Sequence, residues 1–161
     1  MRPDWVVREA GREDAEGFVR AHEASWDAVG LVEQRLGELV SFDQRLKMFE
    51  AGVEKVSEDA GVWVAEREGA IVGLAVCRCD ENAAELRDLY VVPEAWGSGV
   101  ARALHETALD WMRPRAGEAI LWVGEGNARA RRFYEREGWT ADGETRESPL
   151  GPRELRYRLT L

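Results

Sequence analysis

The feature that most constrains the fold is a strand, a glycine turn and a helix written consecutively over residues 89–112, LYVVPEAWGSGVARALHETALDWM. The unbroken apolar run Leu-Tyr-Val-Val is typical of a strand buried on both faces. An apolar stripe at helical spacing and a following Pro114 support the helix. A helix N-terminus preceded by glycines exposes unpaired N–H groups, so residues 97–102, here called the glycine turn, are predicted to bind phosphate oxygens.

Two better-known phosphate-binding loops do not match the glycine turn. A P-loop requires Gly-x-x-x-x-Gly-Lys-Ser/Thr, a string that the chain lacks. The dinucleotide fingerprint G-x-G-x-x-G is met in its first two glycines only, and a four-residue spacer separates the turn from its strand. We therefore expect a different phosphate-bearing ligand. Its contacts would come from Gly97, Ser98, Gly99, Val100, Ala101 and Arg102.

Periodicity along the rest of the chain predicts an α/β fold of the order β-αα-βββ-α-β-α-ββ. We expect one domain over residues 1–161, with a mixed, mostly antiparallel sheet of about seven strands and flanking helices. The strands are expected at 4–9, in a hairpin over 61–79 that turns around 67–69, and at 84–92, 118–123, 139–146 and 153–160. The helices are expected at 13–28, at 32–56 with a break near Ser41, at 100–112 and at 127–137.

Composition excludes several classes of partner. The net charge of −9 argues against nucleic acid and acidic membranes, which both need a basic surface. No stretch is long and apolar enough to span a membrane, and no secretion signal begins the chain, so we expect a cytoplasmic protein. Cys77 and Cys79 are interpreted as ordinary strand residues in a reducing compartment. With two cysteines and two histidines, no metal site of known spacing can be built.

A second motif, NARARRFYEREGW at 127–139, joins the glycine turn in pointing to one family. Together the two segments resemble the GNAT superfamily of acetyl-CoA-dependent N-acetyltransferases. The family's first signature, Gln/Arg-x-x-Gly-x-Gly/Ala, aligns with residues 96–101. Its second, N-x-x-A-x-x-F-Y-x-x-x-G-F, is met throughout except that Trp139 replaces Phe. The departure in the first signature is Trp96, which stands where the family usually has Gln or Arg and leaves the glycine backbone intact.

The resemblance implies a GNAT-like acyl-CoA N-acyltransferase fold and direct transfer of an acetyl group from acetyl-CoA to a primary amine in a ternary complex. Binding of coenzyme A would use the main chain of Leu89, Tyr90 and Val91 and a contact from Asn127, which is also an obvious helix N-cap. Periodicity alone favours Tyr134 as a packed tyrosine beside Phe133. The second signature makes it the candidate general acid, because a phenol is protonated at neutral pH and can donate to a thiolate.

Glu85 is the candidate general base, at the strand position where several family members carry a glutamate that acts through water. A substrate ammonium must lose a proton before attack, which a carboxylate near water assists. Asp88 and Glu125 are alternatives, and Glu85 can also be read as an exposed strand residue paired with Arg87. Trp26, at the end of the first helix, is a candidate substrate contact, because that junction lines the acceptor pocket in this family.

Other features leave the interpretation open. Four arginines in the last helix, at positions 129, 131, 132 and 136, could bind the 3′-phosphate of coenzyme A or form a solvated face. The amine acceptor, a small molecule or a peptide, has no readable motif, and a homodimer is possible. The alternative functions are a coenzyme A-binding sensor without catalysis and a transferase of another acyl group.

Overall fold

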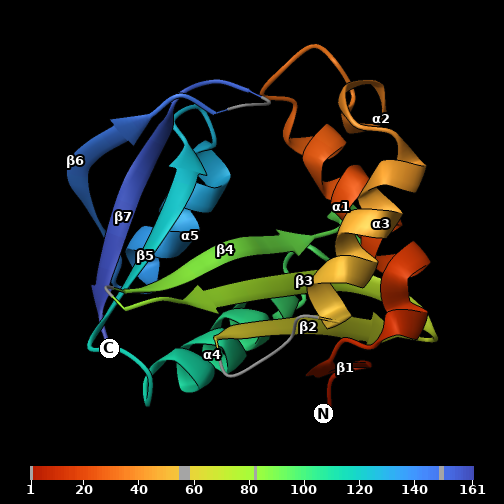
Figure 1. Cartoon of the computed structure of the whole chain (residues 1–161), viewed down its shortest axis with the longest axis horizontal. Helices are drawn as coiled ribbons and strands as arrows, with labels where there is room; N and C mark the ends of the chain where they lie inside the picture. Colours follow the sequence, from red (N-terminus) through yellow and green to blue (C-terminus); the bar gives the residue numbers. More distant parts are fainter. Residues whose placement is uncertain (1, 55–58, 82, 149–150) are drawn as a thin grey trace.

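The computed structural model of the protein describes residues 2–54, 59–81, 83–148 and 151–161. Within them the strands form a seven-stranded sheet in the order β1-β2-β3-β4-β5-β7-β6 (Figure 1). All neighbouring strands are antiparallel except β4 and β5, which are parallel, so the expected mixed sheet is confirmed. The strands are β1 (Trp5–Glu9), β2 (Ala60–Arg67), β3 (Ala70–Cys79), β4 (Ala84–Val91), β5 (Glu118–Gly124), β6 (Thr140–Arg146) and β7 (Glu154–Thr160).

Helices cover both faces of the sheet. The α-helices are α1 (Ala15–Val29), α2 (Leu36–Leu39), α3 (Phe42–Glu54), α4 (Val100–Met112) and α5 (Ala128–Arg136), and Arg12–Asp14 and Pro93–Ala95 form short 3₁₀ turns. Helix α1 packs on β3 and β4, and α4 packs on the opposite face of the same strands (Figure 1). The break expected near Ser41 separates α2 from α3, and Ser41 and Gln44 cap α3 with reciprocal bonds. Residues 55 and 56 of the expected helix lie outside the described residues.

The hairpin of β2 and β3 turns where the sequence predicts. Glu68 and Gly69 both have positive φ, 51° and 80°. Positive φ at both central residues is the conformation of a two-residue hairpin turn whose twist matches that of the strands it joins. The turn therefore fixes the register in which Arg67 pairs with Ala70.

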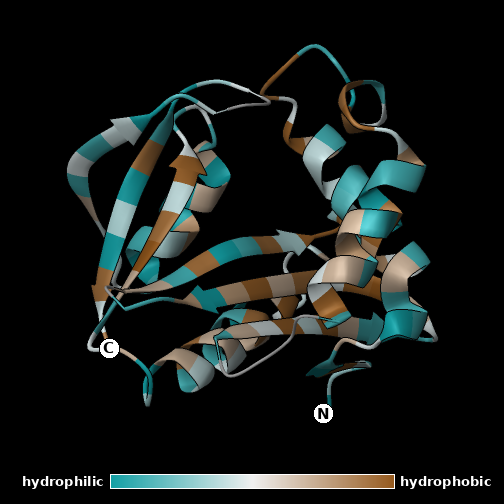
Figure 2. Cartoon of the chain, viewed as in Figure 1, coloured by the Kyte–Doolittle hydropathy of each residue, from teal (hydrophilic) through white to brown (hydrophobic). Residues whose placement is uncertain are grey.

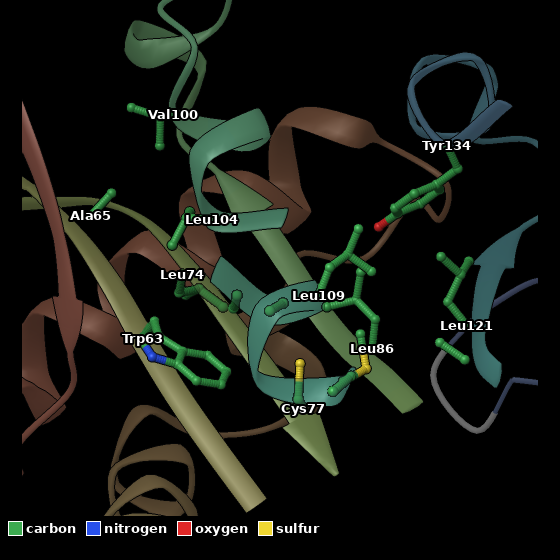
Figure 3. Close-up of a cluster of buried hydrophobic side chains, with 14 of the residues drawn as sticks. Trp63, Ala65, Leu74, Cys77, Leu86, Val100, Leu104, Leu109, Leu121 and Tyr134 are labelled. Carbon is green, nitrogen blue, oxygen red and sulfur yellow. The ribbon is translucent and has the colours of Figure 1, made fainter. Parts of the chain in front are cut away.

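The main core lies between α4 and the central strands (Figure 3). Leu74, Val100 and Leu104 are fully buried, and the rings of Trp63 and Trp111 meet edge to face at 5.9 Å. Burying a side chain of leucine size contributes about 1.5–3 kcal/mol, so this interface holds the start of α4 firmly on the sheet. In contrast, β6 is exposed along its length, and its ribbon is mostly hydrophilic (Figure 2).

Strand β4 separates from β5 over most of its length. The two strands pair only at Ala84 with Ala119 and at Glu85 with Ile120, and beyond Glu85 they diverge into a wedge (Figure 1). The register between β3 and β4 shifts here, because Val76 pairs with Asp88 while the next residue, Cys77, pairs with Leu86. Arg87 is therefore an extra residue in β4, and such a bulge bends a strand away from its neighbour.

Candidate active site

Two adjoining cavities occupy the wedge. The larger, about 490 Å³, lies between the glycine turn, β4 and α5, and is called the arginine cavity because four arginines line it. The smaller, about 100 Å³, lies between β4, β5 and the end of α1 and is called the carboxylate cavity after Asp88 and Glu154. The residues that line both are Val29, Leu89, Tyr90, Asn127, Ala130 and Tyr134. A ligand in one cavity can therefore reach a ligand in the other past this shared wall.

The glycine turn has the conformation that its glycines predict. Gly97 and Gly99 have φ of 75° and 89°, in the region that disfavours other residues, and both line the arginine cavity. The first amide of this helix with a backbone acceptor is that of Ala103, which donates to the Gly99 carbonyl at 3.0 Å. Ser98 N–H donates weakly to Ala95 at 3.3 Å. Within the described residues, the following amides have no acceptor: Gly97, Gly99, Val100, Ala101 and Arg102.

Side chains of the turn serve mainly to fix it. Val100 is fully buried in the core, and the Ser98 hydroxyl donates to Ala95. The Ser98 carbonyl accepts a bond from the Trp5 indole at 3.2 Å, which ties the turn to β1. Arg102 lines the arginine cavity but is shared with Glu106, one helical turn further on. The backbone amides of the turn are therefore its available anion-binding groups.

Trp96 does more than fill space at the edge of the arginine cavity. Its indole Nε1–H donates to the Val91 carbonyl of β4 at 2.9 Å. The guanidinium carbon of Arg129 lies over the Trp96 ring, 4.0 Å from the ring centroid. Trp96 therefore contacts β4 and α5 from the start of the glycine turn, two contacts that the sequence does not indicate.

The four arginines of α5 divide into two groups. Arg129, Arg132 and Arg136 are exposed and line the arginine cavity. Arg131 instead donates to the Tyr157 hydroxyl at 3.1 Å and to the Glu125 carbonyl at 3.0 Å, so it fastens α5 to the sheet. Both interpretations of the basic run thus apply, to different residues.

Tyr134 and Asn127 lie on the shared wall, as the second signature predicts. The Asn127 side-chain oxygen accepts from Ala130 N–H at 3.1 Å and caps α5. The side-chain NH2 group of Asn127 has no hydrogen-bond acceptor among the described residues and can donate to a ligand. Tyr134 is buried between Phe133 and Trp139, and its ring extends away from α5 (Figure 3). Among the described residues no group hydrogen-bonds to its hydroxyl, and burial raises the pKa of that hydroxyl above its usual value.

Asp88 and His22 are two ionisable residues near Tyr90 that influence each other's pKa. His22 on α1 meets the Tyr90 ring edge to face at 4.7 Å, and Asp88 lies on the same side of β4 as Tyr90. Burial raises the pKa of the Asp88 carboxyl, and the neighbouring His22 opposes this. Burial likewise lowers the pKa of His22, while Asp88 favours its charged form. His22 precedes Trp26 by four residues, so the two side chains lie on one face of α1.

The carboxylates that the sequence offered as a base occupy different places. Asp88 lines the carboxylate cavity. Glu85 is half-buried at the paired end of β4, opposite Arg78 and Ile120, and lines neither cavity of the wedge. Glu125 is exposed and bound to Arg153 at 2.9 Å, which lowers its pKa. Glu85 remains a prediction, and the geometry favours Asp88.

Aromatic and paired side chains complete the carboxylate cavity. Trp26 lines it from α1, where the sequence predicts a substrate contact, and Trp122 lines it from β5. Arg146 stacks over the Trp122 ring at 4.4 Å and pairs with Glu154 at 2.6 Å. Glu154 already has a cation, whereas no described residue forms a salt bridge with Asp88, so Asp88 is the carboxylate of this cavity that can receive a positive ligand group.

Within the described residues, no helix combines the length and the hydropathy needed to cross a membrane. The same residues hold no group of three or more His, Cys, Asp or Glu side chains arranged to bind a metal ion.

The sequence matches the model of the Acetyltransferase (GNAT) family over residues 17–139, a span that includes β4, the glycine turn, β5 and α5. The chain belongs to this family, and the resemblance found from its two signatures is confirmed.

Individual relatives agree with the family. An uncharacterized N-acetyltransferase of Archaeoglobus fulgidus is 31% identical over 80% of this chain and 88% of its own length. One of Mycobacterium tuberculosis is 39% identical over 56% of this chain, which spans 58% of that relative. Among solved structures, the PaiA N-acetyltransferase of Thermoplasma acidophilum, in complex with coenzyme A, superposes with a TM-score of 0.83 at 17% identity. It covers 98% of this chain and 99% of its own, so the GNAT fold extends over the whole sheet.

Proposed function

We propose that the protein transfers the acetyl group of acetyl-CoA directly to an amine, with both substrates bound together in the wedge. The observation that carries this proposal is the Tyr134 hydroxyl, which has no hydrogen-bond partner among the described residues and belongs to a residue on the wall shared by a cation-lined and a carboxylate-lined cavity. A donor rich in phosphate suits the first cavity and an ammonium suits the second. The thioester and the amine would then meet at Tyr134.

The arginine cavity fits coenzyme A by the chemistry of its donors. Free amides at the start of α4 suit a pyrophosphate, since they carry the positive end of the helix dipole. Gly97 has nothing within 4 Å of where a Cβ would be, so the backbone there is open to close approach. Beyond its two pairs with β5, β4 offers main-chain groups of Leu89–Val91 for the pantetheine arm and the acetyl oxygen, except for the Val91 carbonyl, which accepts from Trp96.

Tyr134 is proposed as the general acid. The amine nitrogen bonds to the acetyl carbon, the carbon–sulfur bond breaks, and the sulfur takes the proton of the Tyr134 hydroxyl. A raised pKa keeps this hydroxyl protonated at neutral pH, as an acid must be. The resulting phenolate is short-lived, since water can reprotonate it through the open cavity.

Asp88 is proposed to receive the ammonium group and its proton. Because its pKa is raised, the carboxyl is a better proton acceptor than an ordinary aspartate near neutral pH. His22 provides a second site for that proton beside it. Glu85 remains the alternative base and would have to act through water from outside the cavity.

An acyl-enzyme has no suitable nucleophile in the described residues. Cys77 is fully buried, and burial raises the pKa of its thiol to about 12. Burial also raises the pKa of the Cys79 thiol. Neither thiol lines the wedge, which favours direct transfer. Two free thiols are also consistent with a cytoplasmic protein.

The test is release of free coenzyme A from acetyl-, propionyl- and succinyl-CoA across a panel of amines. We expect acetyl transfer, with kcat lowered about 100-fold in Tyr134→Phe and little change in the KM for acetyl-CoA. Tyr157→Phe is the matched control, because that hydroxyl bonds to Glu135 and Arg131 instead of facing the wedge.

Two results would contradict the proposal. Binding of acetyl-CoA without transfer to any amine would identify a coenzyme A sensor. A clear preference for propionyl- or succinyl-CoA would identify a transferase of that acyl group.

A further inference from the structure

Trp96 is fixed in place by its own polar group. Its indole donates to the Val91 carbonyl at 2.9 Å, so the ring is tied to the free end of β4. Its backbone follows the turn Pro93–Ala95 and leads into the glycine turn. Although 39% of the residue is exposed, the ring has few alternative positions while this bond is kept.

Arg129 lies over that ring, and its guanidinium is not neutralised by a carboxylate among the described residues. Its guanidinium lies 4.0 Å from the indole, within the distance at which a cation is attracted to an aromatic face. No carboxylate within the described ranges pairs with it, whereas Arg102 is paired with Glu106. The planar guanidinium therefore keeps its N–H donors available, and a stacked guanidinium can still bind a phosphate through its edge.

The surroundings select an anion as the partner. Trp96 precedes the N-terminus of α4 and Arg129 lies in the first turn of α5, so their contact joins two helix N-termini. Arg132 and Arg136 add positive charge, and none of the described residues lining this cavity is Asp or Glu. The two helix N-termini and the arginines at this cavity favour phosphate over a neutral ligand.

We propose that Trp96 and Arg129 form a bridge across the mouth of the arginine cavity, in which the indole positions the guanidinium to bind a phosphate group of coenzyme A. This deepens the proposed function and rests on it. Where the family signature usually supplies a polar side chain at the turn, this chain supplies the charge from α5 and uses Trp96 to hold it. Trp96 is therefore a positioning residue and Arg129 a binding residue.

The experiment is a double-mutant cycle on coenzyme A affinity, measured by titration calorimetry. We expect Arg129→Ala and Trp96→Leu each to weaken binding about tenfold, and the double variant to be no weaker than about 20-fold. Arg129→Lys, which keeps the charge without the planar fork, should lie between wild type and Arg129→Ala. Arg113→Ala, an exposed arginine at the far end of α4, is the matched control and should bind normally.

Dephospho-CoA identifies the phosphate. If Arg129 binds the 3′-phosphate, Arg129→Ala will weaken coenzyme A binding but leave dephospho-CoA unchanged. If it binds the pyrophosphate, both ligands will weaken equally. Either result supports the bridge.

The bridge is overturned if both single variants bind within about twofold of wild type, or if the double variant loses the full product of about 100-fold. Wild type that binds neither ligand would overturn the proposed function itself. Wild type that binds but does not transfer would overturn catalysis and leave the bridge standing. Trp96→Phe, which keeps an aromatic face without the indole N–H, separates stacking from the bond to Val91.

Discussion

The two cavities of the wedge share a wall but have opposite charge. Among the described residues, the arginine cavity is lined by four arginines and no carboxylate: Arg102, Arg129, Arg132 and Arg136. The carboxylate cavity is lined by Asp88 and Glu154 together with Arg87. The protein as a whole carries a net charge of −9, which describes neither cavity. Overall charge is therefore a poor guide to what a site binds, because potential inside a cleft is set by the groups that line it.

The largest expected effect comes from adding a negative charge to the arginine cavity beside the backbone amides of the glycine turn. Gly99→Glu would place a side chain and a negative charge among the free amides, and like-charge contact should weaken acetyl-CoA binding by more than about 100-fold. Calorimetric affinity is the measurement. Gly143→Glu is the matched control for strain, because Gly143 also has a φ of 89° but lies in exposed β6. Equal affinity in Gly99→Glu and wild type would remove the phosphate assignment.

A smaller effect is expected from the carboxylate cavity. Asp88→Asn should lower kcat/KM for the amine about 100-fold at pH 7 and leave the affinity for acetyl-CoA nearly unchanged, because it removes a proton acceptor from the amine side only. Glu85→Gln, on the same strand but outside the cavity, should retain activity close to wild type. The opposite ranking of the two variants in a pH–rate profile would assign the base to Glu85.

The smallest expected effect concerns stability beneath the arginine cavity. His105 on α4 is buried, its Nε2 accepts from the Trp139 indole at 2.9 Å, and its Nδ1 lies 4.0 Å from Glu137. Burial lowers its pKa in the folded state, although Glu137 and Glu106 oppose this. The unfolded state therefore binds the proton of His105 more readily than the folded state does. The free energy of unfolding should lose nothing to this residue above about pH 6.5 and should decrease as pH falls below that value.

Thermal melts between pH 7 and pH 5 check this decline. His105→Gln, which keeps an acceptor for Trp139 but cannot be protonated, should show a smaller drop in Tm over that range. A drop as large as in wild type would attribute the effect to His22, whose pKa burial also lowers.

Sequence patterns predicted the elements well where local chemistry decides them. The hairpin at 67–69, the helix break near Ser41 and the glycine turn each rest on a few adjacent residues with a preferred conformation. Tyr134 and Asn127, which the second signature singles out, both line the shared wall.

The sequence could not predict what depends on distant pairing. The extra residue Arg87 in β4 is defined only by its register against β3, so the bend that it introduces into the strand cannot be read from β4 alone. The contact of Trp96 with Arg129 joins residues from different helices, so no spacing rule reveals it. Glu85 was preferred over Asp88 because the family resemblance places a base glutamate at that strand position, and the resemblance carries no information about which carboxylate of this chain lines a cavity.

Two small residues lie at the junction of β4 with β5, where the wedge between these strands begins. Ala84 and Ala119 are fully buried and form one of the two residue pairs that join these strands. From there to Val91 the strand runs about 20 Å, so a tilt of about 5° at the junction moves its far end by about 2 Å. A displacement of that size is enough to misalign reacting groups, although neither alanine lines either cavity. Substitution of either alanine by a larger side chain would therefore change the width of the cleft from a position outside both cavities.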